Sequence, residues 1–263
     1  MDPGTLAGII LTFISLLVAM IMEGGNPASI ILPPPLMLVF LGTFGVAMAG
    51  GKLKDFTGAM ASLKTAFLAA PVADDETIAN IVTFADKARR EGLLALEEAA
   101  RTVEDPFLRK GIELAVDGTD PDELREILEA EIASKKAADK VSVKVFNDMG
   151  AYGPTIGIIG TVLGLIHVLE NLSEPDKLGH LIAGAFVATL WGVLSANVFW
   201  FPISKKLDRM AGVEAKHMEL VLEGVTSIQA GANPRVVEQK LLSFLPPAER
   251  AAAAEAAGEA QAA

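Results

Sequence analysis

Four long apolar stretches alternate with polar segments along the chain. They cover residues 4–22, 30–50, 149–169 and 181–203. A helix of about 20 residues rises about 30 Å, which matches the hydrocarbon core of a bilayer. The pattern therefore predicts four transmembrane helices, arranged as two pairs with a long polar segment between them.

The polar segment between the second and third apolar stretches has its apolar residues at helical spacing. Gly92 and the Asp105–Pro106 pair are expected to end two successive helices, because glycine weakens a helix and the residue before proline avoids the helical region. A further helix is expected to begin at Pro121. No helix breaker follows before Gly150, so this helix is predicted to continue into the third apolar stretch.

The patterning divides the chain into five segments. Residues 1–50 and 149–203 are each predicted to hold two transmembrane helices, and residues 51–148 a helical cytoplasmic domain. Residues 204–245 are predicted to form a helical cytoplasmic tail. The alanine-rich residues 246–263 have too few large apolar groups to bury a core and are predicted to be disordered. The expected fold class is thus an all-α membrane protein.

The distribution of basic residues predicts the orientation in the membrane. Residues 51–148 hold fourteen Lys and Arg and residues 204–263 hold seven, whereas residues 23–29 hold none and residues 171–180 hold one. Positive loops stay on the cytoplasmic side, so both termini are expected in the cytoplasm. The first stretch lacks a basic flank and a small-residue cleavage site, and is interpreted as a retained helix rather than a signal peptide.

Composition removes several classes of function. The chain has no cysteine, and its three histidines do not have metal-ligand spacing. A net charge of −11 disfavours nucleic acid as a partner. No nucleophile–base pair and no phosphate-binding loop is found, so no catalytic residue, metal or cofactor is expected and the chain is not predicted to be an enzyme.

The third and fourth stretches each carry small residues every three or four positions. Such a face lets two helix backbones approach closely, which is how helices associate in lipid. We expect these residues to form a close-packing face: Gly153, Gly157, Gly160 and Gly164 on the third stretch, and Gly184, Ala188, Gly192 and Ser195 on the fourth.

Hydroxyls and prolines add chemistry to the same two stretches. Thr161 and Thr189 lie near their middles, where a hydroxyl can bond its own helix or offer oxygen to a partly dehydrated cation. Pro154 and Pro202 each remove a backbone hydrogen bond and are candidate hinges.

Apart from His167, no ionisable residue lies well inside any stretch. Ion relays normally need an intramembrane carboxylate, so the chain is either a scaffold or part of a channel completed by another chain.

Three segments resemble the MotA/PomA family, the larger membrane subunit of the bacterial flagellar stator. They are GPTIGIIGTVLGLI at residues 153–166, AFVATLWGVLSANVFWFP at residues 185–202 and ARREGLLALE at residues 88–97. The last segment places Arg89 and Glu97 at the family's rotor-facing positions, with Arg90 and Glu98 adjacent to them. Without the resemblance, these four charges are typical of a solvated helix surface.

The resemblance implies a homo-oligomeric ring, expected to be a pentamer, in the bacterial inner membrane. The ring would surround a dimer of a single-span, peptidoglycan-anchored partner, MotB or PomB, whose membrane aspartate carries the ion. Ion flow would turn the ring, and the charges would act on the cytoplasmic rotor switch protein FliG, with membrane lipid around the complex. Threonine at position 161 is typical of sodium-driven members, so sodium is favoured over the proton as the transported ion.

Two other functions stay open from the residues. An ExbB/TolQ-like energiser of an envelope or defence machine has a similar organisation, although such proteins usually have three spans. A membrane scaffold without transport is the other alternative, and an ion-flux assay with a co-expressed partner separates it from both.

Overall fold

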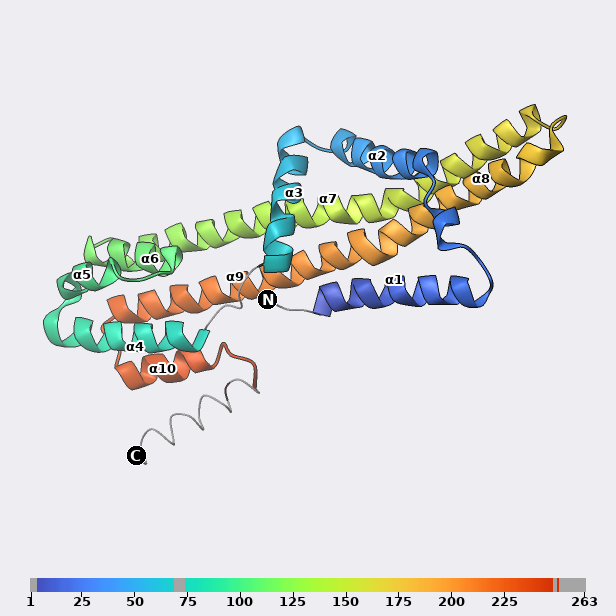
Figure 1. Cartoon of the computed structure of the whole chain (residues 1–263). Helices are drawn as coiled ribbons and strands as arrows, with labels where there is room; N and C mark the ends of the chain where they lie inside the picture. Colours follow the sequence, from blue (N-terminus) through green and yellow to red (C-terminus); the bar gives the residue numbers. More distant parts are fainter. Residues whose placement is uncertain (1–3, 69–73, 248–249, 251–263) are drawn as a thin grey trace. The chain divides into compact units, whose positions relative to one another are not determined.

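The computed structural model describes residues 4–68, 74–247 and 250, and every regular element within them is helical (Figure 1). This confirms the all-α prediction. Most of the tail predicted to be disordered, residues 246–263, lies outside the described residues.

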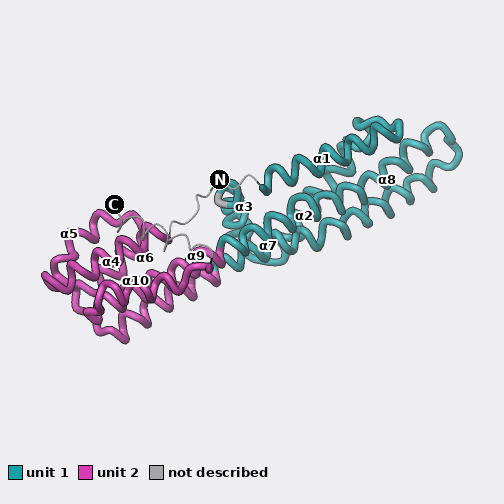
Figure 2. The backbone as a smooth tube through the Cα atoms, turned by 90° about the horizontal axis from the view of Figure 1, so that it is seen from below, with its two compact units in different colours: residues 1–70, 138–210 teal, residues 71–137, 211–263 magenta. Residues whose placement is uncertain are grey.

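The chain forms two compact units (Figure 2). Met1–Ala70 and Ala138–Met210 form the first unit, and Pro71–Ala137 and Ala211–Ala263 form the second. Two long helices, α7 (Pro121–Glu170) and α9 (Phe201–Gln229), supply residues to both. The assignment of these parts to membrane and cytoplasm stays a prediction.

The first unit contains the apolar helices. Among the described residues, three helices are long and apolar enough to cross a membrane: α1 (Gly4–Met22), α7, and the continuous helical run Pro175–Gln229. A fourth apolar helix, α2 (Pro33–Ala49), is shorter. The four-span topology therefore stays a prediction. The other elements of this unit are the 3-10 turn η1 (Pro27–Ile30), α3 (Leu53–Leu68), α8 (Pro175–Ser195), the π-helical turn η3 (Ala196–Trp200) and the start of α9.

The second apolar stretch becomes helical later than the sequence pattern predicted. The helix α2 starts at Pro33 rather than Ile30, because proline is favoured at the first helical position, where its missing N–H is not needed. The turn η1 precedes it and is capped by the side chain of Asn26. The indole Nε1 of Trp191 donates a hydrogen bond of 2.6 Å to the carbonyl oxygen of Ile30, which attaches η1 to α8.

The helix α7 is continuous from Pro121 to Glu170, as the absence of breakers predicted. Its start is capped by Asp120, whose carboxylate accepts a hydrogen bond of 2.9 Å from the backbone N–H of Asp122. Pro154 lies inside the helix without ending it.

The run from α8 into α9 contains a local change of helix type. The backbone N–H of Phe201 bonds the carbonyl oxygen of Ala196, five residues back, which is a π-helical bond. Pro202 follows immediately and has no N–H to donate. The side-chain amide of Asn197 donates to the carbonyl oxygen of Val193 at 2.8 Å. The helix thus continues past the proline with an altered hydrogen-bond ladder.

The second unit is a helical bundle around its own core. It comprises α4 (Asp74–Glu91), η2 (Leu93–Ala95), α5 (Leu96–Ala100), α6 (Pro106–Val116), α10 (Pro234–Leu242) and parts of α7 and α9. Its fully buried side chains include Ile81, Leu96, Leu108, Leu124, Leu128 and Leu220. Gly92 separates α4 from η2, as predicted. The helix α5 ends at Ala100 rather than Asp105, and Asp105 instead caps α6 through the N–H of Phe107 at 2.8 Å.

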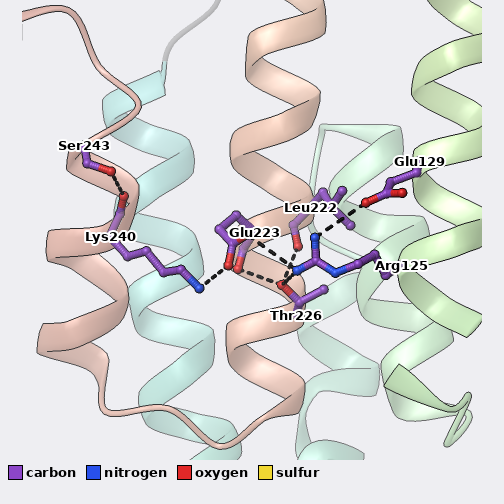
Figure 3. Close-up of polar contacts among 7 residues, drawn as sticks. All are labelled: Arg125, Glu129, Leu222, Glu223, Thr226, Lys240 and Ser243. Carbon is purple, nitrogen blue, oxygen red and sulfur yellow. Dashed lines mark hydrogen bonds and ion pairs between the residues drawn. The ribbon is translucent and has the colours of Figure 1, made fainter. Parts of the chain in front are cut away.

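A polar cluster joins three helices of the second unit (Figure 3). Glu223 on α9 lies between two cations, Lys240 on α10 and Arg125 on α7. The Arg125 guanidinium is 3.5 Å from the Glu223 carboxylate and also donates to the hydroxyl of Thr226 at 3.4 Å. Because Glu223 is largely buried, this carboxylate helps to hold α7, α9 and α10 together.

Candidate functional site

The helices α7 and α8 touch through their backbones. A Cβ atom added at Gly157 would lie 2.8 Å from the carbonyl oxygen of Ala188, and one at Gly192 would lie 2.7 Å from the carbonyl oxygen of Gly153. Real Cβ atoms essentially never approach so closely. Only glycine therefore fits these positions without displacing a helix.

The same contact line, which we call the α7–α8 seam, continues toward the end of α7. A Cβ atom at Gly160 would lie 2.7 Å from the Cβ of Ala188, and one at Gly164 would lie 2.7 Å from the Cβ of Ala185. The seam also includes Ser195, which faces Gly153.

Gly184 lies outside the seam, contrary to the small face predicted from the sequence. A Cβ atom there would meet nothing within 4 Å. The predicted face used steps of four residues from Gly184 to Gly192. One helical turn takes 3.6 residues, so each step of four shifts the position of the residue by about 40° around the helix axis. The contact line instead follows Ala185, Ala188 and Gly192, whose mixed steps of three and four keep it facing α7.

Thr161 and Thr189 meet across this seam. Their hydroxyl groups form a hydrogen bond with each other. The Thr161 hydroxyl is also 3.0 Å from the carbonyl oxygen of Ala185 and 3.2 Å from that of Gly157. The Thr189 hydroxyl is 3.4 Å from the same Gly157 carbonyl. Four oxygen atoms from two helices thus gather at one half-buried place, the hydroxyl cluster.

The two prolines lie beside the seam in different ways. Pro154 is one residue after Gly153, at the end where α7 meets Gly192 and Ser195. Pro202 follows the π-helical turn at the end of the α8 run. Each marks a place where the normal ladder of backbone hydrogen bonds is interrupted.

The four predicted rotor-facing charges lie on either side of the Gly92 turn, at the end of α4 and the start of α5. All four are exposed, but two are already paired. The Arg90 guanidinium lies 3.0 Å from the Asp86 carboxylate, and Glu97 lies 3.2 Å from Arg101. Arg89 and Glu98 form no ion pair within the described part of the chain. The resemblance placed Arg89 and Glu97 at the rotor-facing positions and Arg90 and Glu98 beside them, and of these four the structure pairs Arg90 and Glu97 with neighbours on their own helices.

Comparison with known proteins decides the family. The profile of the MotA/TolQ/ExbB proton channel family matches residues 99–220. Motility protein A of Bacillus subtilis is 37% identical over 99% of this chain and 97% of its own length. The chain belongs to the MotA/PomA family.

Further similarities extend over the whole MotA/PomA chain. Chemotaxis protein PomA of Vibrio alginolyticus is 35% identical over 95% of this chain and 98% of its own length. The structure of the flagellar MotAB stator complex from Bacillus subtilis contains a chain that matches with a TM-score of 0.87 and 35% identity, over 94% of this chain and 98% of that one. The resemblance seen in the three sequence segments is thus confirmed.

An apolar cavity of about 450 Å³ lies next to the seam of this MotA/PomA-family chain. The start of α2, the end of α7 and the start of α8 line it. Gly184 opens onto this cavity rather than onto α7. His167 and His180 belong to the same lining, and His167 is exposed beside Glu170.

The second unit contains a histidine cluster that was not predicted from the sequence. His217 on α9 hydrogen-bonds through Nδ1 to Asp74 at 2.6 Å and through Nε2 to Asp105 at 2.9 Å. Only 12% of the His217 side chain is exposed. The cluster connects α9 to the first residue of α4 and to the cap of α6.

The groups of the histidine cluster favour the protonated form of His217 and the ionised form of Asp105. Burial by itself lowers the pKa of His217, but the hydrogen bonds and charges of Asp105 and Asp74 outweigh burial, so the pKa is raised. Burial likewise raises the pKa of Asp105, and the hydrogen bonds from His217 and the Phe107 N–H outweigh it, so the pKa is lowered. The two carboxylates therefore stabilise the imidazolium form of His217, which can donate a hydrogen bond to each of them.

A signal for this cluster was present in the sequence. His217 occupies a position on the apolar stripe of its helix, and a histidine there is buried and needs partners. The partners were not predictable, because Asp74 and Asp105 are far from it in sequence and the Asp105–Pro106 pair was interpreted only as the end of a helix.

Proposed function

We propose that this chain is the ring-forming subunit of a flagellar motor stator and conducts ions only with a MotB-type single-span partner. The observation that carries the proposal is the likeness of nearly the whole chain, the α7–α8 pair included, to a chain of the flagellar MotAB stator complex from Bacillus subtilis. Motility protein A of the same organism matches over 99% of this chain.

The residue content of the apolar helices indicates that a carboxylate for ion transport would have to come from another chain. Residues 4–22, 33–49, 149–166 and 181–203 contain no Asp, Glu, Lys or Arg. An ion pathway through a bilayer normally uses a carboxylate, which a membrane aspartate of the partner would supply. A ring of this chain, expected to be a pentamer, would surround a dimer of the peptidoglycan-anchored partner in the bacterial inner membrane, with lipid outside and both termini in the cytoplasm.

The seam would serve as the rigid wall of this ring. Gly153, Gly157 and Gly192 bring the backbones of α7 and α8 into contact, so the pair moves as one piece. The interrupted backbone ladders at Pro154 and Pro202 would absorb the bending that ion passage causes. Torque would reach the rotor switch protein FliG through the charges beside Gly92, with Arg89 and Glu98, which form no ion pair with any described residue, as the contacts.

The hydroxyl cluster supports sodium as the coupling ion. A sodium ion must exchange part of its hydration shell for protein oxygens, whereas a proton needs only the partner's carboxylate. Thr161 and Thr189 place hydroxyl oxygens beside the carbonyls of Gly157 and Ala185, which is a set of oxygens that could take part in this exchange.

Deletion of the gene in a motile host tests the proposed function. We expect cells that still assemble flagella but do not swim, with swimming restored by the wild-type chain. Arg89→Glu and Glu98→Lys should each restore it poorly, whereas Arg235→Glu, an exposed charge on α10, should restore it fully. Normal swimming in the deletion strain together with a defect in envelope transport would favour the ExbB/TolQ-like alternative.

A further inference from the structure

Leu94 is the most exposed large apolar side chain among the described residues of the second unit. It is 74% exposed, compared with 55% for Val236, 44% for Val213 and 40% for Phe244. Single exposed leucines are common on protein surfaces. This one differs in its backbone setting and in the charges that surround it.

The turn that carries Leu94 is held in one shape. Gly92 has a φ of +87°, a conformation that favours glycine, and its carbonyl oxygen accepts a hydrogen bond of 3.2 Å from the N–H of Ala95. On either side of Leu94, Leu93 packs against the core and Leu96 is 0% exposed. The side chain is thus presented outward by an anchored turn, and little backbone entropy is lost when it is covered.

Exposed charged residues precede and follow Leu94 in the sequence, on the two helices that its turn connects. Arg89 lies in the last turn of α4, Glu98 lies in the first turn of α5, and both are exposed and unpaired within the described residues. Protein–protein contacts typically combine an apolar centre with a charged border, and the centre carries most of the affinity.

We propose that Leu94 is the apolar anchor of the contact with the rotor. It inserts into an aliphatic depression of the rotor protein, which places a carboxylate opposite Arg89 and a basic group opposite Glu98. The inference rests on the proposed function and assigns to the rotor contact an apolar residue between the charged ones.

A protein surface fits this patch better than a membrane does. Glu91, Glu97 and Glu98 lie beside Leu94 in the sequence, and these carboxylates would repel the anionic headgroups of the cytoplasmic leaflet. Opposite charges on the two sides of the turn instead match a partner that carries both signs.

Salt dependence separates the anchor from the rim. The purified stator complex would be bound to the immobilised rotor switch protein at 0.1 M and about 0.5 M NaCl, because exposed charges are screened within about 10 Å at the lower concentration and within a shorter distance at the higher. We expect Leu94→Ala to weaken binding about tenfold at both concentrations, since burial of a leucine does not depend on ionic strength. The effect of Arg89→Glu should shrink at high salt.

Site-specific crosslinking tests contact directly. The chain has no cysteine, so Leu94→Cys supplies the only thiol of this chain, to which a thiol-reactive photo-crosslinker is attached before the labelled stator complex is mixed with the rotor switch protein. The expected product is an adduct with the rotor switch protein. Val236→Cys, an exposed apolar position on α10, is the matched control and should give no adduct.

Swimming assays distinguish failure of this inference from failure of the proposed function. Leu94→Asp should abolish swimming, while the protein level in the membrane and its thermal unfolding stay unchanged because the side chain is exposed. If Arg89→Glu stops swimming and Leu94→Asp does not, the anchor is wrong and the stator function stands. If deletion of the whole gene leaves swimming normal, both are wrong.

Discussion

Gly157 shows how strongly the absence of one methyl group determines the contact between α7 and α8. We predict that Gly157→Ala lowers the thermal unfolding midpoint of the detergent-solubilised complex, because its Cβ would lie 2.8 Å from a backbone oxygen of α8. Such overpacking costs about 1–3 kcal/mol. The control is Gly184→Ala, where the methyl group meets nothing within 4 Å. Equal midpoints for both variants would contradict the geometry of the seam.

Thr161 gives a prediction about the ion. Thr161→Ala should raise the sodium concentration needed for half-maximal swimming speed severalfold, because it removes one oxygen from the hydroxyl cluster. Thr161→Ser keeps a hydroxyl and should restore most of the response. Thr155→Ala, which removes only a hydroxyl bonded to Tyr152 of its own helix, is the matched control. Undiminished swimming of the wild type without sodium would rule out the sodium proposal.

For single residues, the sequence predicted which residues take part in helix contacts better than it predicted what each of them touches. The three- and four-residue spacing from Gly153 to Gly164 indicated a close-packing face, and the structure places those glycines against α8. The spacing could not show that Gly184 faces a cavity, because the second helix contributes its own rotation. The pairing of Thr161 with Thr189 depends on how two helices align, which no single helix pattern contains.

Among the elements, the long helix α7 followed most directly from the sequence. Asp120 and Pro121 supply a cap and a favoured first residue, and no breaker follows before Gly150. The end of α5 was less predictable. Asp105 and Pro106 indicated a boundary, but they mark the start of α6, and α5 ends earlier at Ala100.

The histidine cluster predicts how the elements of the second unit respond to pH. The pKa of His217 is raised above its usual value of 6.5, so its contribution to stability is complete below about pH 6.5 and is lost as the pH rises through the raised pKa. The pKa of Asp105 is lowered, so its contribution is present above its usual value of 3.8 and is lost on acidification through the lowered pKa. Stability from the cluster is thus largest in mildly acidic solution.

The measurement is thermal unfolding of the full chain as a function of pH. We predict that the wild-type unfolding midpoint falls as the pH rises from about 6.5 through the raised pKa of His217. His217→Gln should be less stable at pH 6.5 and should lack this fall. Two other acidic residues, Glu76 and Glu104, line a second cavity, of about 420 Å³, next to His217, and they are unchanged in both proteins. Parallel pH curves for the two proteins would show that His217 is not responsible.

For the whole molecule, the sequence predicted segments but not the contacts between distant ones. Length and hydropathy indicated where the apolar helices lie, because each helix carries that signal by itself. The joining of His217 to Asp74 and Asp105, and of Glu223 to Arg125 and Lys240, requires a folded bundle. The apolar cavity beside the seam is likewise a product of three helices and has no local signature.

The central claim is that this chain forms the wall of an ion pathway in which the partner chain supplies the carboxylate. The most direct test is cation flux into liposomes that contain the purified chain alone, the chain with its single-span partner, or the chain with a partner whose membrane aspartate is changed to asparagine. We predict flux only with the unaltered partner. Robust cation flux through the chain alone would contradict the account.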